Sequence, residues 1–139
     1  MQDDRYTFGI RLDAPFATVR ESVEAALKSE GFGILTEIDV AATLLAKLGV
    51  ERDPYVILGA CNPPLAHRAI TADPSVGALL PCNVVVQTDG DRTVVEAMDP
   101  RAAMGLIDEA EISAVAEEAR AKLVRVVEMV EKRFETAGA

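Results

Sequence analysis

The sequence contains no tryptophan and only one histidine, and aromatic residues make up 4% of its 139 residues. His67 is thus the only imidazole that can serve as a base, and no serine or threonine stands in a motif that would pair with it. The glycine-rich phosphate loop, the Gly-x-Ser-x-Gly elbow, the His-Glu-x-x-His motif and the EF-hand loop are also missing. A serine–histidine–aspartate hydrolase is therefore strongly disfavoured, and no short motif assigns an activity.

Basic residues are scarce as well. The chain has 14 lysines and arginines against 23 aspartates and glutamates, a formal net charge of −9. Its densest basic group, at Arg120, Lys122 and Arg125, alternates with glutamates at helical spacing, which is typical of ion pairs on a solvated helix face. Because binding to a phosphate backbone depends on clustered cations, we expect no nucleic-acid partner.

Long apolar runs are missing too. The first ten residues carry Asp3 and Asp4 where a signal peptide needs positive charge, and no window approaches 18 uncharged apolar residues. We therefore expect a cytoplasmic protein with no membrane partner. In that compartment the two cysteines, Cys61 and Cys82, are expected to be reduced rather than joined in a disulfide.

The hydrophobic half of the sequence consists mostly of alanine, valine, leucine and isoleucine. A chain of this size buries roughly two thirds of the surface that it exposes when extended, which suffices for one core but not for two. We predict a single soluble domain over residues 1–139 with an aliphatic core.

Alternating and helical hydrophobic patterns, bounded by proline, glycine and aspartate, predict five strands and four helices. The predicted strands are 6–12, 31–39, 55–61, 82–88 and 92–98, and the predicted helices are 16–30, 40–48, 63–72 and 112–134. An Asp89-Gly90 turn joins the last two strands in the clearest hairpin. This order favours an α+β fold, with a single mostly antiparallel sheet and helices packed on one face, over a doubly wound parallel sheet.

Two of the predicted strands, 55–61 and 82–86, carry valine and leucine on both faces. Such strands are either central in the sheet or covered on the second face by another subunit. Since the apolar residues exceed what one sheet face needs, we expect a homodimer.

Four blocks of the chain resemble a known family. They are GFGILTEIDV (31–40), PYVILGACNP (54–63), LLPCNVVV (79–86) and VEAMDP (95–100), and they are similar to the blocks of domain-of-unknown-function family 302. The resemblance spans nearly the whole chain and implies a compact, often homodimeric α+β domain with a two-layer arrangement of sheet and helices like that of TATA-binding protein. The resemblance assigns no activity, and it leaves the cofactor open. The positions that match the family's pattern are Glu37, Asp39, Lys47, Cys61, Asn62, Pro63, Pro81, Cys82, Asn83 and Asp99.

A repeated Cys-Asn dipeptide is the most suggestive chemical feature. Cys61-Asn62 ends one predicted strand, and Cys82-Asn83 starts another. If these strands are antiparallel neighbours, the two thiols lie at the same end of the sheet and can form a redox dithiol or a soft-metal site. If the strands are parallel, the thiols lie at opposite ends. The alternative is that both cysteines are small buried hydrophobes, and the spacing of the cysteines and His67 matches no zinc motif.

Two polar residues near these strands have both a structural and a functional interpretation. Asn62 is expected to cap the following helix by accepting a hydrogen bond from the backbone N–H of Leu65. Glu37 is expected to share a strand face with Gly33, where burial would raise its pKa and suit it to acid–base work. Its alternative is a solvent-exposed carboxylate, free or paired with Lys47.

Three functions remain open from the sequence. The first is binding of a small molecule or metal in a pocket between sheet and helices, the second is a homodimeric structural or interaction protein, and the third is a thiol-dependent redox or sulfur-handling enzyme. The candidate ligand-binding residues are Glu37, Cys61, Asn62, Cys82 and Asn83. No catalytic residue, metal ion or cofactor is assigned.

Overall fold

The structure, a computed structural model, describes residues 1–3 and 6–138, with side chains described through Glu135. One six-stranded sheet runs in the order β1-β2-β6-β5-β4-β3. The strands are β1 (Gln2–Asp3), β2 (Thr7–Leu12), β3 (Gly33–Asp39), β4 (Tyr55–Cys61), β5 (Cys82–Asp89) and β6 (Arg92–Met98). The helices are α1 (Phe16–Ser29), α2 (Val40–Leu48), α3 (Pro63–Ala72), the 3-10 helix η1 (Pro74–Leu79), α4 (Pro100–Met104) and α5 (Ala110–Gly138).

Every pair of neighbouring strands in the sheet is antiparallel. The predicted α+β class is confirmed, and the parallel alternative is wrong. The predicted hairpin is also present, with Asp89 opposite Arg92 at its turn and Val84 opposite Ala97 at its open end. Since β4 and β5 lie between other strands, the apolar residues on both of their faces are explained in part by an interior position in the sheet.

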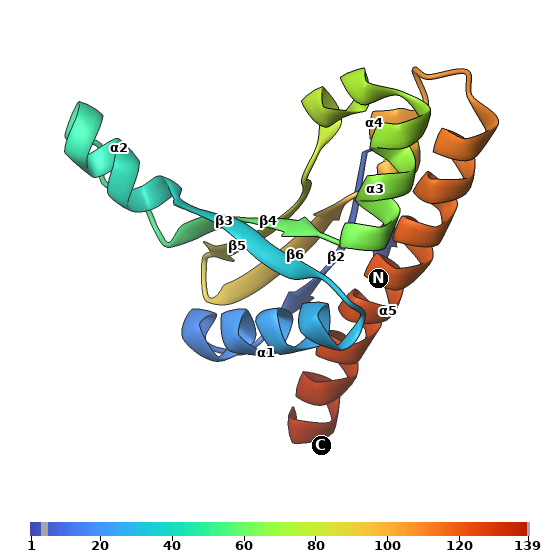
Figure 1. The fold of residues 1–139 in the computed structure, drawn as a ribbon. Coiled ribbons are helices and arrows are strands. Elements are labelled where there is room, and N and C mark those ends of the chain that lie inside the picture. Colours follow the sequence, from blue (N-terminus) through green and yellow to red (C-terminus); the bar gives the residue numbers. More distant parts are fainter. Residues whose placement is uncertain (4–5, 139) are drawn as a thin grey trace.

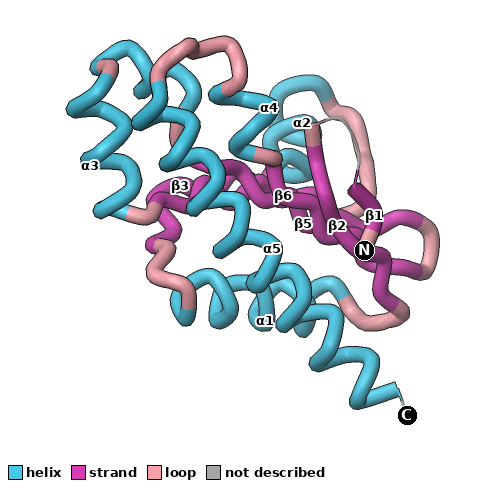
Figure 2. The backbone as a smooth tube through the Cα atoms, turned by 90° about the vertical axis from the view of Figure 1, so that its right-hand side faces the viewer, coloured by secondary structure: helices cyan, strands magenta, loops and turns pink. Residues whose placement is uncertain are grey.

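The main core lies on one face of the sheet, between its strands and the helices α1 and α5 (Figure 1). Alternation along the strands points Leu58, Val84 and Val86 into it, and each of these side chains is at most 1% exposed. In the view turned by 90°, α1 and α5 lie together along this face of the sheet (Figure 2). The aliphatic composition therefore appears as a continuous layer of valine and leucine between sheet and helices.

A second, smaller core extends beyond the sheet. There α3, η1 and α4 pack around the N-terminal half of α5. Its buried members are Leu65, Ala69, Val76, Met104, Ile112, Val115, Ala116 and Ala119. The long helix α5 therefore belongs to both cores and fixes the position of α3 relative to the ends of β4 and β5.

Helix α2 is the element least connected to either core. It begins at Asp39, whose side chain accepts a hydrogen bond from the Ala42 N–H at 2.9 Å, and it ends at Gly49 in the left-handed conformation, with φ of 65°. None of its nine residues is buried. Because it connects β3 to β4, it projects from the tip of that hairpin, away from the other helices (Figure 1). Among the described residues, no helix combines the length and apolar character that crossing a membrane requires.

Candidate functional site

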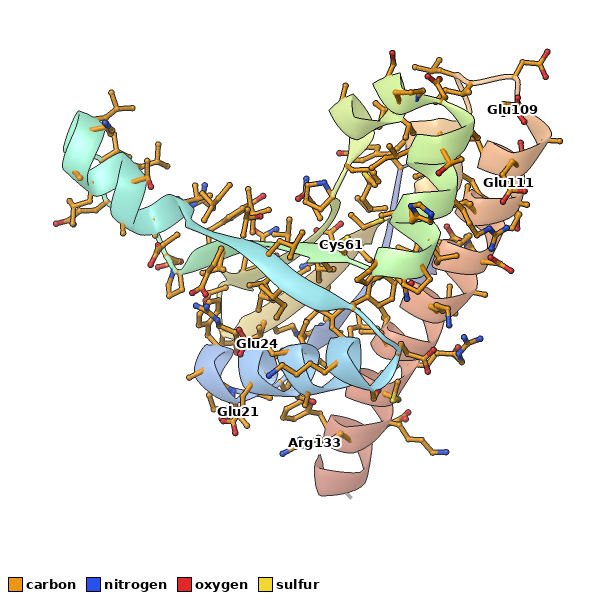
Figure 3. The ribbon with its side chains drawn as sticks, viewed as in Figure 1. Glu21, Glu24, Cys61, Glu109, Glu111 and Arg133 are labelled. Carbon is orange, nitrogen blue, oxygen red and sulfur yellow. The ribbon has the colours of Figure 1, made fainter. Side chains whose placement is uncertain are left out.

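The two Cys-Asn dipeptides lie at the same end of the sheet. Strands β4 and β5 are antiparallel neighbours, and Cys82 is directly opposite Ala60, the residue before Cys61. Both cysteines are free thiols, Cys82 buried and Cys61 half-buried. Cys61 ends β4 where the chain turns into α3 (Figure 3). The condition under which the thiols share one end of the sheet is therefore met.

Both cysteines line one cavity of about 310 Å³ between the end of the sheet, α3 and α5. Its lining residues are Phe32, Leu35, Ala60, Cys61, Asn62, Leu65, Ala66, Ala69, Ile70, Gly77, Leu80, Pro81, Cys82, Met104, Val115 and Ala119. None of these residues carries a formal charge at neutral pH, and Asn62 is the only amide among them. The cavity therefore offers apolar contact area and very few hydrogen-bonding groups.

The cavity is closed by both cores and open towards solvent on one side. Ala60, Ala69 and Val115 form part of its inner wall, and each is at most 2% exposed. Leu35 and Ile70 also line it, yet they are 67% and 44% exposed. These two large apolar side chains therefore mark the mouth of the cavity, where a ligand would enter and cover them.

Asn62 performs the capping role expected from the sequence. Its Oδ1 accepts a hydrogen bond from the Leu65 N–H at 3.4 Å, and its Nδ2 donates to the carbonyl oxygen of Glu30 at 3.3 Å. The side chain thus joins the start of α3 to the end of α1. One N–H and one lone pair of the amide remain for a ligand after these two bonds.

The environment of Cys82 keeps its thiol protonated. Burial raises the pKa of Cys82 to about 11, and the nearby Cys61 adds to this rise because it would place a second negative charge close by. At neutral pH the Cys82 sulfur is therefore a neutral thiol in an apolar wall. A protonated thiol is a poor nucleophile and a poor metal ligand.

We expect the raised pKa of Cys82 to slow the alkylation of its thiol. In the Cys61→Ser variant, which retains Cys82 alone, iodoacetamide at pH 8 should react about a hundredfold more slowly with the folded protein than with the urea-unfolded protein, because a pKa about two units higher leaves about a hundredfold less thiolate. The Cys82→Ser variant provides the matched control, since its remaining thiol, Cys61, is half-buried rather than buried. Equal labelling of Cys82 in the folded and unfolded protein would contradict its position in the wall.

Glu37 and Asn83 lie outside the cavity. A register shift between Ile34 and Thr36 interrupts the alternation of β3, so that Glu37 is opposite Leu58 while Gly33 is opposite Cys61. The expectation that Glu37 and Gly33 share a strand face is therefore wrong. Glu37 is exposed, and its ion pair is with Arg20 of α1 rather than with Lys47.

Asn83 follows Cys82 in β5, and its side chain is exposed. It is opposite Gly59, on the sheet face away from Cys82 and the main core. Of the five candidate residues, the structure brings Cys61, Asn62 and Cys82 together at the cavity and places Glu37 and Asn83 elsewhere.

The helical part of the lining was not foreseen from the sequence. Leu65, Ala66, Ala69 and Ile70 form a stripe of spacing i, i+1, i+4 and i+5 along α3, wider than packing on α5 alone requires. That width is the signal that could have indicated a cavity wall. Nothing in the sequence pairs this stripe with Met104 of α4, because only the fold brings α4 beside it.

Three comparisons with known proteins bear on this site. The family model described as "Domain of unknown function DUF302" matches residues 8–130. The comparison with curated proteins finds no match. Among solved structures, the chain is similar to an uncharacterised conserved DUF302 protein from Bacillus stearothermophilus, with 27% sequence identity and a TM-score of 0.83, over 89% of this chain and 97% of that one.

Proposed function

The chain belongs to the DUF302 family, and we propose that it binds a small, neutral, largely apolar molecule in the cavity between β4, α3 and α5. The observation that carries the proposal is the apolar cavity of about 310 Å³ with exposed Leu35 and Ile70 at its mouth. Small-molecule sites are typically concave, mostly apolar and supplied with a few polar groups, and this volume is at the lower end of their range.

The wall chemistry selects the class of ligand. A charged molecule would lose its hydration without gaining an ion pair, because no lining residue is charged. A neutral molecule of about two fused rings would instead bury its own apolar surface and that of Leu35 and Ile70. Asn62 can give one hydrogen bond to a polar group at one end of such a molecule.

The alternative of thiol chemistry receives less support. A redox dithiol or a soft-metal site needs thiolates, and burial holds the pKa of Cys82 at about 11. Cys82 therefore acts as a polarisable part of the apolar wall. Cys61 is half-buried and also lines the cavity, so it provides a second sulfur surface for contact with a ligand.

Binding of N-phenyl-1-naphthylamine, a neutral dye that fluoresces in apolar surroundings, tests this proposal. We expect the wild-type protein to enhance its fluorescence saturably, and the Ala66→Trp variant to bind it at least about tenfold more weakly, because the indole would occupy the cavity. Ala66 is half-buried in the wall, and the smaller Ala66→Leu variant provides a second, milder filling of the same space.

The matched control is Ala25→Trp. Ala25 is an exposed alanine of α1 outside the cavity, so the same side chain there should leave dye binding unchanged. Far-UV circular dichroism checks that each variant is folded. The proposal fails if the wild-type protein does not bind the dye, or if both Ala66 variants bind it as well as the wild type does.

A further inference from the structure

The exposed apolar surface of α2 is the strongest feature that the proposed cavity does not use. Ala41, Leu45 and Leu48 recur at i, i+4 and i+7 and form one stripe along the helix. Leu45 is 53% exposed and Leu48 is 70% exposed, and Val50, directly after the helix, is 46% exposed. A stripe of this kind normally packs against another element, but these leucine and valine side chains are exposed, and α2 stands apart from the other helices (Figure 1).

A groove lies directly beside this stripe. It has a volume of about 790 Å³ and lies between α2, the start of α1 and the segment 51–56 that leads into β4. Leu45 lines the groove from α2, and Phe16 and Tyr55 line it from the body of the protein. The same patch of surface thus carries both a projecting apolar helix and a groove with apolar walls.

The charges around this patch favour a cation on the helix that enters the groove. Lys47 is the only charged residue of α2, whereas the groove is lined by the carboxylates of Asp39, Glu51 and Asp53 and by the guanidinium groups of Arg20 and Arg52. Arg20 is paired with Glu24 and Glu37, and Arg52 lies over the ring of Tyr55. Lys47, Glu51 and Asp53 have no ion-pair partner among the described residues, so acidic groups are in excess at the groove and the projecting helix carries a free cation.

We infer that this patch is the interface with a second copy of the chain, in which α2 of each copy lies in the groove of the other. A two-fold dimer brings the same patch of both copies together, so the patch must be complementary to itself. A projecting helix beside a groove meets this condition, because each helix fills the other copy's groove. Lys47 of each copy then lies near Glu51 and Asp53 of the partner.

This interface is distinct from the ligand cavity proposed above. The groove includes Tyr55 and Val56 at the start of β4, whereas the cavity includes Ala60 and Cys61 at its end. The two inferences can therefore be tested separately. Loss of dimerisation need not alter dye binding, and filling the cavity need not alter the mass in solution.

Sedimentation velocity at protein concentrations from about 1 to about 100 μM measures the dissociation constant of the dimer. We expect the wild-type protein to be a dimer. We expect the dissociation constant of Leu48→Glu to be at least roughly thirtyfold higher, because each dimer would bury two unpaired charges in an apolar contact. Leu48 makes no buried contact within its own chain, so the monomer should remain folded. The matched control is Leu106→Glu, which adds the same charge at a leucine that is 89% exposed elsewhere and should leave the dimer intact.

A charge exchange tests the arrangement of the two copies. Lys47→Glu and the double variant Glu51→Lys/Asp53→Lys should each dimerise more weakly than the wild type, since like charges would face each other. Mixing the two should restore a heterodimer, because every contact then joins opposite charges again. A wild-type monomer at 100 μM, a dimer unaffected by Leu48→Glu, or a failure of the mixed variants to associate would each overturn the inference.

Discussion

Replacing Gly9 by alanine is expected to destabilise the fold by about 3 kcal/mol, a large part of the 5–15 kcal/mol that holds a typical domain together. Gly9 lies in β2 opposite Glu96 of β6. A Cβ atom at this position would collide with the carbonyl oxygen of Val95 and come within 2.9 Å of the Glu96 Cα. Because both are backbone atoms of a paired strand, only a displacement of the sheet can relieve the collision.

Gly77→Ala is the matched control for this substitution. A Cβ atom at Gly77 would meet no heavy atom within 4 Å. The same added methyl group should therefore change the free energy of unfolding by less than about 1 kcal/mol, and a reduced entropy of the unfolded chain favours a small gain. Urea unfolding followed by circular dichroism measures both variants. Equal stability of Gly9→Ala and Gly77→Ala would contradict the close pairing of β2 and β6.

The elements of the fold could be predicted because their signals are local. Asn62 and the two prolines after it start α3, and the Asp89-Gly90 turn places β5 beside β6. The short elements β1, η1 and α4 were not predicted, since two to six residues are too few for a hydrophobic period to show. The helix over residues 40–48 was predicted correctly, but the sequence does not specify whether a partner element covers its apolar side chains.

The candidate site could be predicted only in part, because its position depends on strand pairing. The two Cys-Asn dipeptides identified Cys61, Asn62 and Cys82, which the antiparallel pairing of β4 and β5 brings to one cavity. The second dipeptide also suggested Asn83, which the regular alternation of β5 places on the other face of the sheet. Glu37 was suggested by the expected alternation of β3, which a register shift between Ile34 and Thr36 interrupts, and no feature of the sequence announces such a shift.

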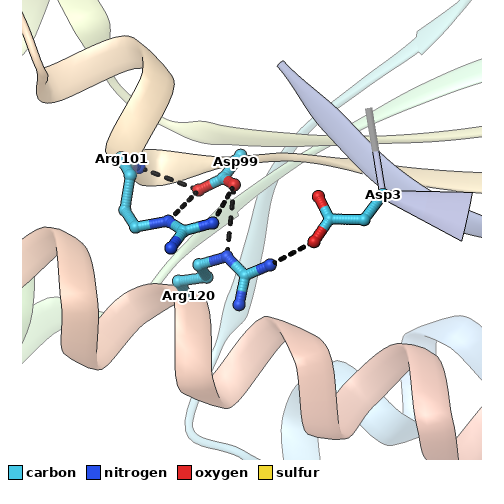
Figure 4. A network of polar contacts seen from close by, with 4 residues as sticks. All are labelled: Asp3, Asp99, Arg101 and Arg120. Atoms are coloured by element: carbon cyan, nitrogen blue, oxygen red, sulfur yellow. Dashed lines mark hydrogen bonds and ion pairs between the residues drawn. The ribbon is translucent and has the colours of Figure 1, made fainter. Parts of the chain in front are cut away.

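A second large effect is expected at Asp99, which is 4% exposed and anchors four segments of the chain. Its carboxylate accepts a hydrogen bond from the backbone N–H of Arg101 at 3.0 Å, and the side chains of Arg101 and Arg120 donate to it as well (Figure 4). Arg120 of α5 also donates to Asp3 of β1 at 2.8 Å and lies over the ring of Phe8. The carboxylate thus joins β6, α4, α5 and the edge strand β1.

The ionisation of Asp99 follows from these contacts. Burial alone would raise the pKa of this carboxyl group, but the hydrogen bonds from the side chain and backbone of Arg101 and from the side chain of Arg120 outweigh burial and lower it. A carboxyl group whose pKa is lower in the folded state stabilises the fold fully above the pKa of its unfolded state. That contribution is lost as the pH falls through the lower, folded value.

Asp99→Asn is therefore expected to lower the free energy of unfolding by about 3 kcal/mol at pH 7, because it leaves the half-buried Arg120 guanidinium with only one carboxylate. The matched control is Asp3→Asn, which removes the other carboxylate on Arg120. Asp3 is 53% exposed, so this loss should cost less than about 1 kcal/mol. Urea unfolding at a series of pH values measures both. The difference in the free energy of unfolding between the wild type and Asp99→Asn should be constant from neutral pH down to about 4. Below that pH it should shrink as the wild-type carboxyl group is protonated. A difference in this free energy that persists undiminished at a pH of about 2 would show that the carboxylate charge is not its cause.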